Sequence, residues 1–292
     1  MAQLSSINVH NRFIKCAGHG DLEGMVRLLA QGADPRHDDS HALRCAAGNG
    51  HAECVKLLIP ASDPKAKDSA ALRWAAQNSH VECVKLLAPV SDALAWDSEA
   101  LASAASNGQA ECVRLLIQAS GPKPQCARAL LAAAHKGNAD CVSLLISASD
   151  PKVDHSMALR WAVKNGHVGC ARLLIPCSDP GSKNSQALCS AVVNGDAECA
   201  RMLIPASALL ADQKPIFAEI IEHGRAEILS LILAAEPRFL DEEDLSARKD
   251  RAIAHGHHEL ATLLLSIIEQ AAFAGHLSPA EGSCAPSAPL RI

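Results

Sequence analysis

The sequence predicts an all-α solenoid of stacked helical hairpins, and two recurring features lead to this prediction. An Ala-Leu pair returns every 29 residues over half of the chain, at 42–43, 71–72, 100–101, 129–130, 158–159 and 187–188. An Asn-Gly pair follows at the same place in four units, at 49–50, 107–108, 165–166 and 194–195. Fixed periods of about 20 to 50 residues are typical of repeat arrays, so the period is considered before any single motif.

Each unit is predicted to begin with a short helix. Ala71, Leu72, Ala75 and Ala76 fall on one helical face, and Ser69 just before them is expected to cap the helix N-terminus. The Asn-Gly pair is expected to end this helix, because both residues tolerate left-handed backbone.

A second short helix is predicted after the turn. Cys54, Val55, Leu57 and Leu58 again share one face, and Pro60 ends the helix because proline cannot continue the hydrogen-bond ladder. Both helices are shorter than the roughly 12 to 15 residues that an isolated helix needs in water. Each pair is therefore expected to be stable only when it is stacked on its neighbours.

The unit resembles the ankyrin repeat. Its pattern reads A-L-R-W-A-A-x-N-G-H-x-E-C-V-K-L-L, which is similar to the ankyrin pattern T-P-L-H-x-A-A-x-x-G-H-x-E-I-V-x-x-L-L. Residues 20–35 read G-D-L-E-G-M-V-R-L-L-A-Q-G-A-D-P and resemble the ankyrin second helix with its Gly-Ala-Asp exit. The resemblance implies an ankyrin-like helical-hairpin solenoid of about nine repeats.

Two departures from the ankyrin pattern are visible. The ankyrin period is about 33 residues, so a period of 29 predicts shortened loops, with the shortfall between Leu58 and Leu72. The T-P-L-H signature is also missing. Arg44, Arg73 and Arg160 stand where its histidine would be.

The turn residues predict nine helical pairs between residues 10 and 269. The units are expected near 10–39, 40–68, 69–97, 98–126, 127–155, 156–184, 185–213, 214–245 and 246–269. Residues 1–9 are expected to form an N-terminal extension. Residues 270–292 are rich in Gly, Ser, Pro and Ala and are expected to form a disordered tail.

Composition favours a soluble, cytoplasmic protein. There is neither an apolar stretch of 18 residues nor a charged-then-apolar amino terminus. Delivery to a host cell without a readable signal is the alternative. The formal net charge is −5 and the basic residues are scattered, so neither nucleic acid nor a membrane is expected as a partner.

Half of the twelve cysteines recur at the repeat period. They are Cys54, Cys83, Cys112, Cys141, Cys170 and Cys199. Stacked helices lie roughly 8 to 10 Å apart, beyond the Cα separation of about 7 Å that a disulfide tolerates. We interpret these cysteines as small core hydrophobes. Cys126, Cys177 and Cys284 are expected in loops or the tail, where oxidation or modification is open to them.

Neither catalysis nor a cofactor is predicted. His51, His80 and His167 recur after the turn, in a position that other units fill with Gln, Asn, Asp or Arg, so we interpret them as polar residues at a helix start. Residues 255–259 have metal-ligand spacing, but 256–259 is the repeat's own G-H-x-E and no metal is predicted. Nucleophile constellations, phosphate-binding glycine loops and paired catalytic carboxylates are absent from the sequence.

Positions that vary between units are candidates for a binding surface, and they form two rows. The first, the link row, comprises 65–69, 94–98, 123–127, 152–156 and 181–185, and in ankyrin-like proteins such tips line one edge of the concave face. Trp96 is its sharpest candidate, because Trp is enriched among interface hot spots; a Trp folded over its own repeat is the alternative. The candidate partner-binding residues of the link row are Lys65, Lys67, Trp96, Asp97, Lys152, Asp154, His155 and Lys183.

The second row, the pre-turn row, is the residue before each turn and borders the groove in ankyrin-like folds. It holds Gly48, Gln77, Ser106, His135, Lys164 and Val193. Gln77, His135 and Lys164 are its candidate partner-binding residues, and a position under no constraint is the alternative. Trp74 and Trp161, beside the core alanines, are interpreted as packing residues.

The leading hypothesis is a non-enzymatic module that binds a protein or peptide partner along the concave face of the stack, since solenoids offer such extended surfaces. An inhibitor or immunity-type protein that blocks a partner enzyme is one alternative, with the acidic run 241–244 imitating an acidic substrate. A secreted effector acting on a host protein is the other alternative.

Overall fold

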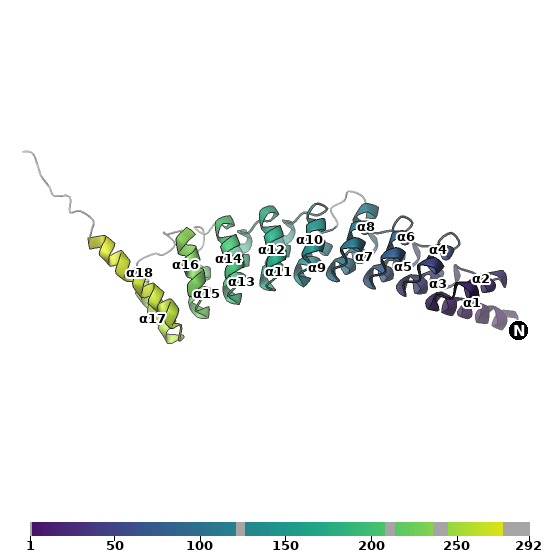
Figure 1. Cartoon of the computed structure of the whole chain (residues 1–292), viewed down its shortest axis with the longest axis horizontal. Helices are drawn as coiled ribbons and strands as arrows, with labels where there is room; N and C mark the ends of the chain where they lie inside the picture. The colour runs from purple at the N-terminus through teal and green to yellow at the C-terminus, as the bar shows by residue number, and fades with distance from the viewer. Residues whose placement is uncertain (1, 121–125, 208–213, 236–244, 277–292) are drawn as a thin grey trace, which may run out of the picture. The chain divides into compact units, whose positions relative to one another are not determined.

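The computed structural model describes residues 2–120, 126–207, 214–235 and 245–276. The chain divides into two compact units, Met1–Leu209 and Leu210–Ile292, which are described separately. The described residues form eighteen α-helices in nine consecutive pairs and no strand (Figure 1). The predicted all-α stack of helical hairpins is confirmed.

The first unit contains seven pairs. Each pair together with the link before it is called a repeat from here on, so its bounds differ from those of the predicted units. Their first helices are α1 (Ala2–His19), α3 (His37–Gly48), α5 (Ala66–Gln77), α7 (Ala95–Ser106), α9 (Ala127–Lys136), α11 (Val153–Lys164) and α13 (Ser182–Asn194). Their second helices are α2 (Leu22–Ala30), α4 (Ala52–Leu58), α6 (Val81–Leu87), α8 (Ala110–Ser120), α10 (Ala139–Ile146), α12 (Val168–Leu174) and α14 (Ala197–Leu203). Short 3-10 turns follow α12 and α14, at Ile175–Cys177 and Ile204–Ala206.

The second unit contains two described pairs. They are α15 (Lys214–His223) with α16 (Ala226–Ala235), and α17 (Leu245–Ala254) with α18 (His258–His276). Residues 2–9, expected to form an extension, are the first part of α1, and α18 continues past residue 270 into the segment expected as a tail. The acidic run 241–244, residues 277–292 and Cys284 lie outside the described residues.

Stacking in the first unit follows two parallel rows. Each first helix packs on the next first helix, as α5 does on α3 and α7, and the second helices pack on each other in the same order (Figure 1). Leu43, Leu72 and Leu101 are completely buried between them. Burying one leucine side chain stabilises the fold by about 1.5 to 3 kcal/mol. The repeated Ala-Leu pair therefore forms a continuous thin core.

The cysteines at the repeat period lie in this core. All six are at most 1% exposed and none forms a disulfide, which agrees with their interpretation as core residues. Cys126 lies in a turn immediately before α9, as predicted, but it is only 2% exposed. Cys177 is half-buried, and its thiol lies 3.2 Å from the carbonyl oxygen of Leu173.

The predicted turns between paired helices have left-handed backbone. Gly50 has φ +80° and Ser79, at the same place in the next repeat, has φ 67°. Gly50 is required for a second reason. A Cβ atom there would lie 2.5 Å from the ring of His80 in the following repeat.

A left-handed segment of three residues begins four first helices of the first unit, and it overturns the predicted role of Ser69. Lys67, Asp68 and Ser69 have φ of 51°, 55° and 56°, so Ser69 cannot occupy a helix N-cap. Its buried hydroxyl oxygen instead accepts a hydrogen bond from the backbone N–H of Asp92 in the next repeat, at 2.9 Å. We call this segment the left-handed turn. It also occurs at 38–40, 96–98 and 154–156.

Arg73 supports the left-handed turn of its own repeat. Its guanidinium donates to the carbonyl oxygens of Lys67 at 3.0 Å and Asp68 at 3.1 Å. Arg160 makes the same pair of bonds to residues 154 and 155. Left-handed conformation costs roughly 1 to 2 kcal/mol per ordinary residue. The arginines at the position of the ankyrin histidine therefore offset part of that cost.

Candidate partner-binding surface

The link row at 65–69, 94–98 and 152–156 contains the left-handed turns of α5, α7 and α11. Lys67 is exposed, and its ammonium lies 2.9 Å from the carboxylate of Asp39 in the preceding repeat. This hydrogen bond lowers the pKa of Asp39 below its ordinary value. Neighbouring turns are thus joined through their side chains as well as through the core.

Trp96 is the most exposed large hydrophobic side chain described, at 62%. Its ring lies over Arg73 of the same predicted unit, 69–97, as the alternative describes, and it also contacts Asp68 of the predicted unit before. Its indole N–H donates to the carboxylate of Asp68 at 2.7 Å, and the guanidinium of Arg73 lies 4.6 Å from its ring centroid. Both partners belong to the preceding repeat. The ring is therefore held in one orientation while much of its surface stays open to solvent.

The remaining candidates of the link row are exposed. Lys65 and Lys152 immediately precede α5 and α11, and each donates its backbone N–H to an aspartate two residues earlier, at 2.9 Å. Asp154, His155 and Lys183 have left-handed φ of 51°, 56° and 49°. Residues 123–125 of this row lie outside the described part of the chain.

The pre-turn row lies at the opposite end of the first helices. Gln77, His135 and Lys164 have exposed side chains, whereas their backbone carbonyls are bonded to the next repeat. The amide N–H₂ of Asn107 donates to the carbonyl of Gln77 at 2.9 Å, and that of Asn194 donates to the carbonyl of Lys164 at 2.9 Å.

The recurring histidines make the same inter-repeat contact. The Nε2 of His80 lies 3.0 Å from the carbonyl oxygen of Gly48, and the Nε2 of His167 lies 3.0 Å from that of His135. Because a carbonyl oxygen only accepts, Nε2 carries the proton. Both histidines stand at the N-cap position of their helices, which agrees with their interpretation as helix-start residues. Their rings do not cap these helices but link successive repeats.

Two tryptophans lie between the rows. The ring centroids of His135 and Trp161 lie 4.9 Å apart in a T-shaped arrangement, and the Lys164 ammonium lies 5.0 Å from the centroid of the Trp161 ring. Trp74 packs against Gly48, where an added Cβ would lie 3.4 Å from the indole, yet it remains 36% exposed. These residues combine packing with exposure and extend the candidate surface from the pre-turn row towards the link row.

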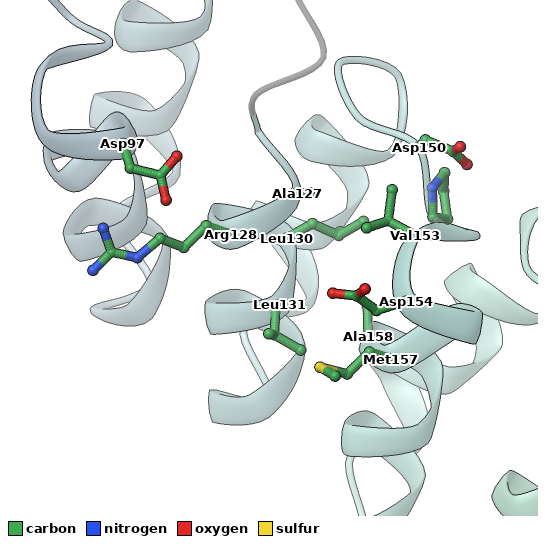
Figure 2. A pocket seen from close by; sticks show the side chains of 11 residues that line it. Asp97, Ala127, Arg128, Leu130, Leu131, Asp150, Val153, Asp154, Met157 and Ala158 are labelled. Carbon is green, nitrogen blue, oxygen red and sulfur yellow. The ribbon is translucent and has the colours of Figure 1, made fainter.

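A pocket of about 200 Å³ brings two candidates of the link row together (Figure 2). It lies between α9 and α11, and Asp97 and Asp154 both line it. Its apolar lining includes Leu130, Leu131 and Met157. Sequence reasoning missed this pocket, although Leu131 stands in a position that three other repeats fill with arginine.

The histidines and cysteines considered for metal or thiol chemistry occupy defined places in the repeats. The described residues contain no group of three or more His, Cys, Asp or Glu side chains able to hold a metal ion. In the second unit, His257 contacts the carbonyl of Glu222 through Nε2 at 2.9 Å, as the other post-turn histidines do. Burial raises the pKa of the Cys83, Cys141 and Cys170 thiols to about 11, so these thiols are protonated at neutral pH.

Comparison with known families accounts for the repeated geometry. The profile described as "Ankyrin repeats (3 copies)" matches residues 13–95, 90–155 and 130–214, more than half of the chain. The chain belongs to the ankyrin repeat family. Ankyrin repeats are generally protein–protein interaction modules, and the fold is typically a non-enzymatic scaffold.

Among solved structures, the ankyrin repeats of this chain are similar to the crystal structure of human ASB11 ankyrin repeat domain. The two share 22% sequence identity with a TM-score of 0.48, over 60% of this chain and 95% of that chain. A search of curated proteins finds no match. Within the described residues, no helix is long and apolar enough to cross a membrane.

Proposed function

We propose that this ankyrin repeat protein binds a protein or peptide partner along the surface formed by the link row, the pre-turn row and the first helices between them. The observation that carries the proposal is Trp96, a large aromatic side chain that is 62% exposed and nevertheless fixed by Asp68 and Arg73.

Fixation of Trp96 favours binding for an entropic reason. Immobilising a side chain at an interface costs about 0.5 to 1.5 kcal/mol, and a side chain already held in place avoids most of that cost. Tryptophan is also among the residues that dominate interface energies. A pre-oriented, exposed indole is therefore suited to serve as an anchor.

The charged residues around Trp96 are suited to form the polar rim of an interface. Asp97 follows it in the sequence, Asp68 and Arg73 contact it, and Asp154, His155 and Lys183 continue the link row through later repeats. Interfaces commonly combine a central aromatic anchor with a surrounding polar rim. The mixture of signs favours a protein or peptide over a uniformly charged polymer as the partner.

The proposal is tested by affinity capture from lysate of the native cell, followed by mass spectrometry. The baits are the wild-type chain and a variant carrying Trp96→Ala, Lys65→Ala and Lys67→Ala. A matched control carries Lys56→Ala and Lys85→Ala on α4 and α6, whose side chains are also exposed. We expect partners to be lost from the link-row variant and retained by the control. Equal capture by all three baits would contradict the proposal.

A further inference from the structure

We propose that the pocket between α9 and α11 binds an apolar side chain of a basic peptide segment. The inference rests on the proposed function, and it adds the chemistry of the partner: a large aliphatic or aromatic residue flanked by lysine or arginine.

The pocket arises from a local change in the repeat. In α11, Arg160 donates to Gln186 of the next first helix at 2.6 Å. One repeat earlier, the same two positions hold Leu131 and Met157. Figure 2 shows these two side chains pointing toward one another across the gap between α9 and α11. A polar contact between neighbouring first helices is therefore replaced by an apolar contact.

The apolar lining is open to solvent. Val153, which also lines the pocket, is 41% exposed, and Leu131 and Met157 are half-buried, whereas Leu130 beneath them is 1% exposed. An engineered apolar cavity of about 150 Å³ holds a benzene ring, so about 200 Å³ accommodates a large side chain. Drug-sized ligands occupy about 300 to 1,000 Å³. The size therefore favours one side chain over a whole cofactor.

The charge at the rim selects the flanking residues. The charged residues lining the pocket are Asp97, Asp150, Asp154 and Arg128. Arg128 is already paired with Glu99 of the preceding repeat. Figure 2 shows the carboxylate of Asp154 directed into the gap between the helices. The net charge around the apolar lining is therefore negative, which complements a cationic peptide.

Among the described residues, the neighbouring Lys152 forms no ion pair with the aspartates that line the pocket. Lys152 is exposed and is not among the lining residues, and only its backbone N–H contacts Asp150. One carboxylate oxygen of Asp150 accepts this bond, and the other carboxylate oxygen is left for a partner. The rim thus combines three aspartates around an apolar floor.

Methionine NMR provides a direct test. The chain has four methionines, and with ¹³C-methyl labelling Met157 reports on the pocket, while the buried Met25 and Met202 of α14 serve as internal controls. The probe is a capped seven-residue peptide with a central phenylalanine and two lysines on each side. Matched peptides replace the phenylalanine by alanine, or all lysines by glutamate. We expect a saturable shift of Met157 alone, with the lysine–phenylalanine peptide only.

Two variants complete the test. Leu131→Arg introduces the arginine that three other repeats have at this position and is expected to abolish the Met157 shift. Asp150→Asn with Asp154→Asn keeps the side-chain shapes, and asparagine tolerates the left-handed backbone of residue 154. This exposed pair is expected to weaken the peptide about three- to tenfold, as two surface charge contacts would.

The inference is overturned if Met157 does not respond to the lysine–phenylalanine peptide, if the glutamate peptide binds equally well, or if Leu131→Arg binds as wild type does. These results are separable from failure of the proposed function. If Met157 does not respond but capture of partners still depends on Trp96, only the pocket proposal is refuted. If Met157 responds but capture does not depend on Trp96, only the proposed partner-binding surface is refuted.

Discussion

Arg73 donates a hydrogen bond to the backbone carbonyl of Lys67, six residues earlier, over 3.0 Å. This contact places a permanent charge beside three consecutive residues of left-handed backbone. It also positions the guanidinium against Trp96 of the following repeat. One side chain therefore connects the stability of a turn to the orientation of the proposed anchor.

Replacing Arg73 by alanine is expected to destabilise the first unit by about 1 to 3 kcal/mol, because hydrogen bonds from a charged donor are lost. Trp96 fluorescence should also change as the ring loses a partner. Urea unfolding measures the first effect. Arg73→Lys retains a charge without the planar fork and should be intermediate. Replacing the exposed Arg201 of α14 by alanine is the control. Wild-type stability of Arg73→Ala would refute the support assigned to this arginine.

Ser69 tests the left-handed turn itself. Ser69→Ala removes the acceptor of the Asp92 N–H in a buried place, which is expected to cost about 1 to 3 kcal/mol. Ser69→Gly loses the same bond but relieves left-handed strain at φ 56°, and should be more stable than the alanine variant by about 1 kcal/mol. Urea midpoints compare the two. Equal stability of the variants would show that the strain is negligible.

Gly50 tests the contact between repeats. Gly50→Ala forces the His80 ring away from its bond with Gly48 and adds backbone strain, for an expected loss of about 2 to 4 kcal/mol. Gly166→Ala has similar φ, +72°, but no atom within 4 Å of the new Cβ, and should cost only about 1 to 2 kcal/mol.

A double-mutant cycle separates the two causes at Gly50. His80→Ala removes the clashing ring, so the double variant should be less destabilised than the sum of the single variants, by about 0.5 to 3 kcal/mol. Additive losses at Gly50 and His80 would mean that the ring moves aside without cost.

Alkaline pH is expected to weaken the fold through its buried thiols. An unfolded cysteine ionises near pH 8.5, whereas the folded pKa of Cys83, Cys141 and Cys170 is about 11. Between these values the unfolded state has lost a proton that the native state retains, so the free energy of unfolding falls as pH rises. Below pH 8.5 this contribution is constant.

Urea unfolding as a function of pH measures this alkaline loss. Thiolate absorbance follows the ionisation without interference from tyrosine, which the chain lacks. Cys83→Val removes one of the groups and should flatten the decline. A decline as steep in Cys83→Val as in wild type would assign the loss to other groups.

Local sequence was sufficient for the fold because Leu72 and Cys83 each repeat with a fixed period, and periodic burial is a local signal. It was insufficient for Ser69, whose type fits an N-cap but whose backbone is set by Arg73 and by Asp92 of the next repeat. The link row was recognised by its variability. The pocket was not recognised, because it forms only where Leu131 of α9 and Met157 of α11 lie together, and the sequence does not show this contact.

The hydrogen-bonded backbone carbonyls of the pre-turn row have an evolutionary consequence. At Gln77, His135 and Lys164 the neighbouring repeat holds the main chain through an asparagine, whatever side chain the position carries. In each of these residues the backbone carbonyl stabilises the stack, whereas the side chain determines the chemistry of the surface. A single nucleotide change can give such a position a new charge or shape without disturbing the stack, so this scaffold can acquire a new specificity by successive one-residue steps.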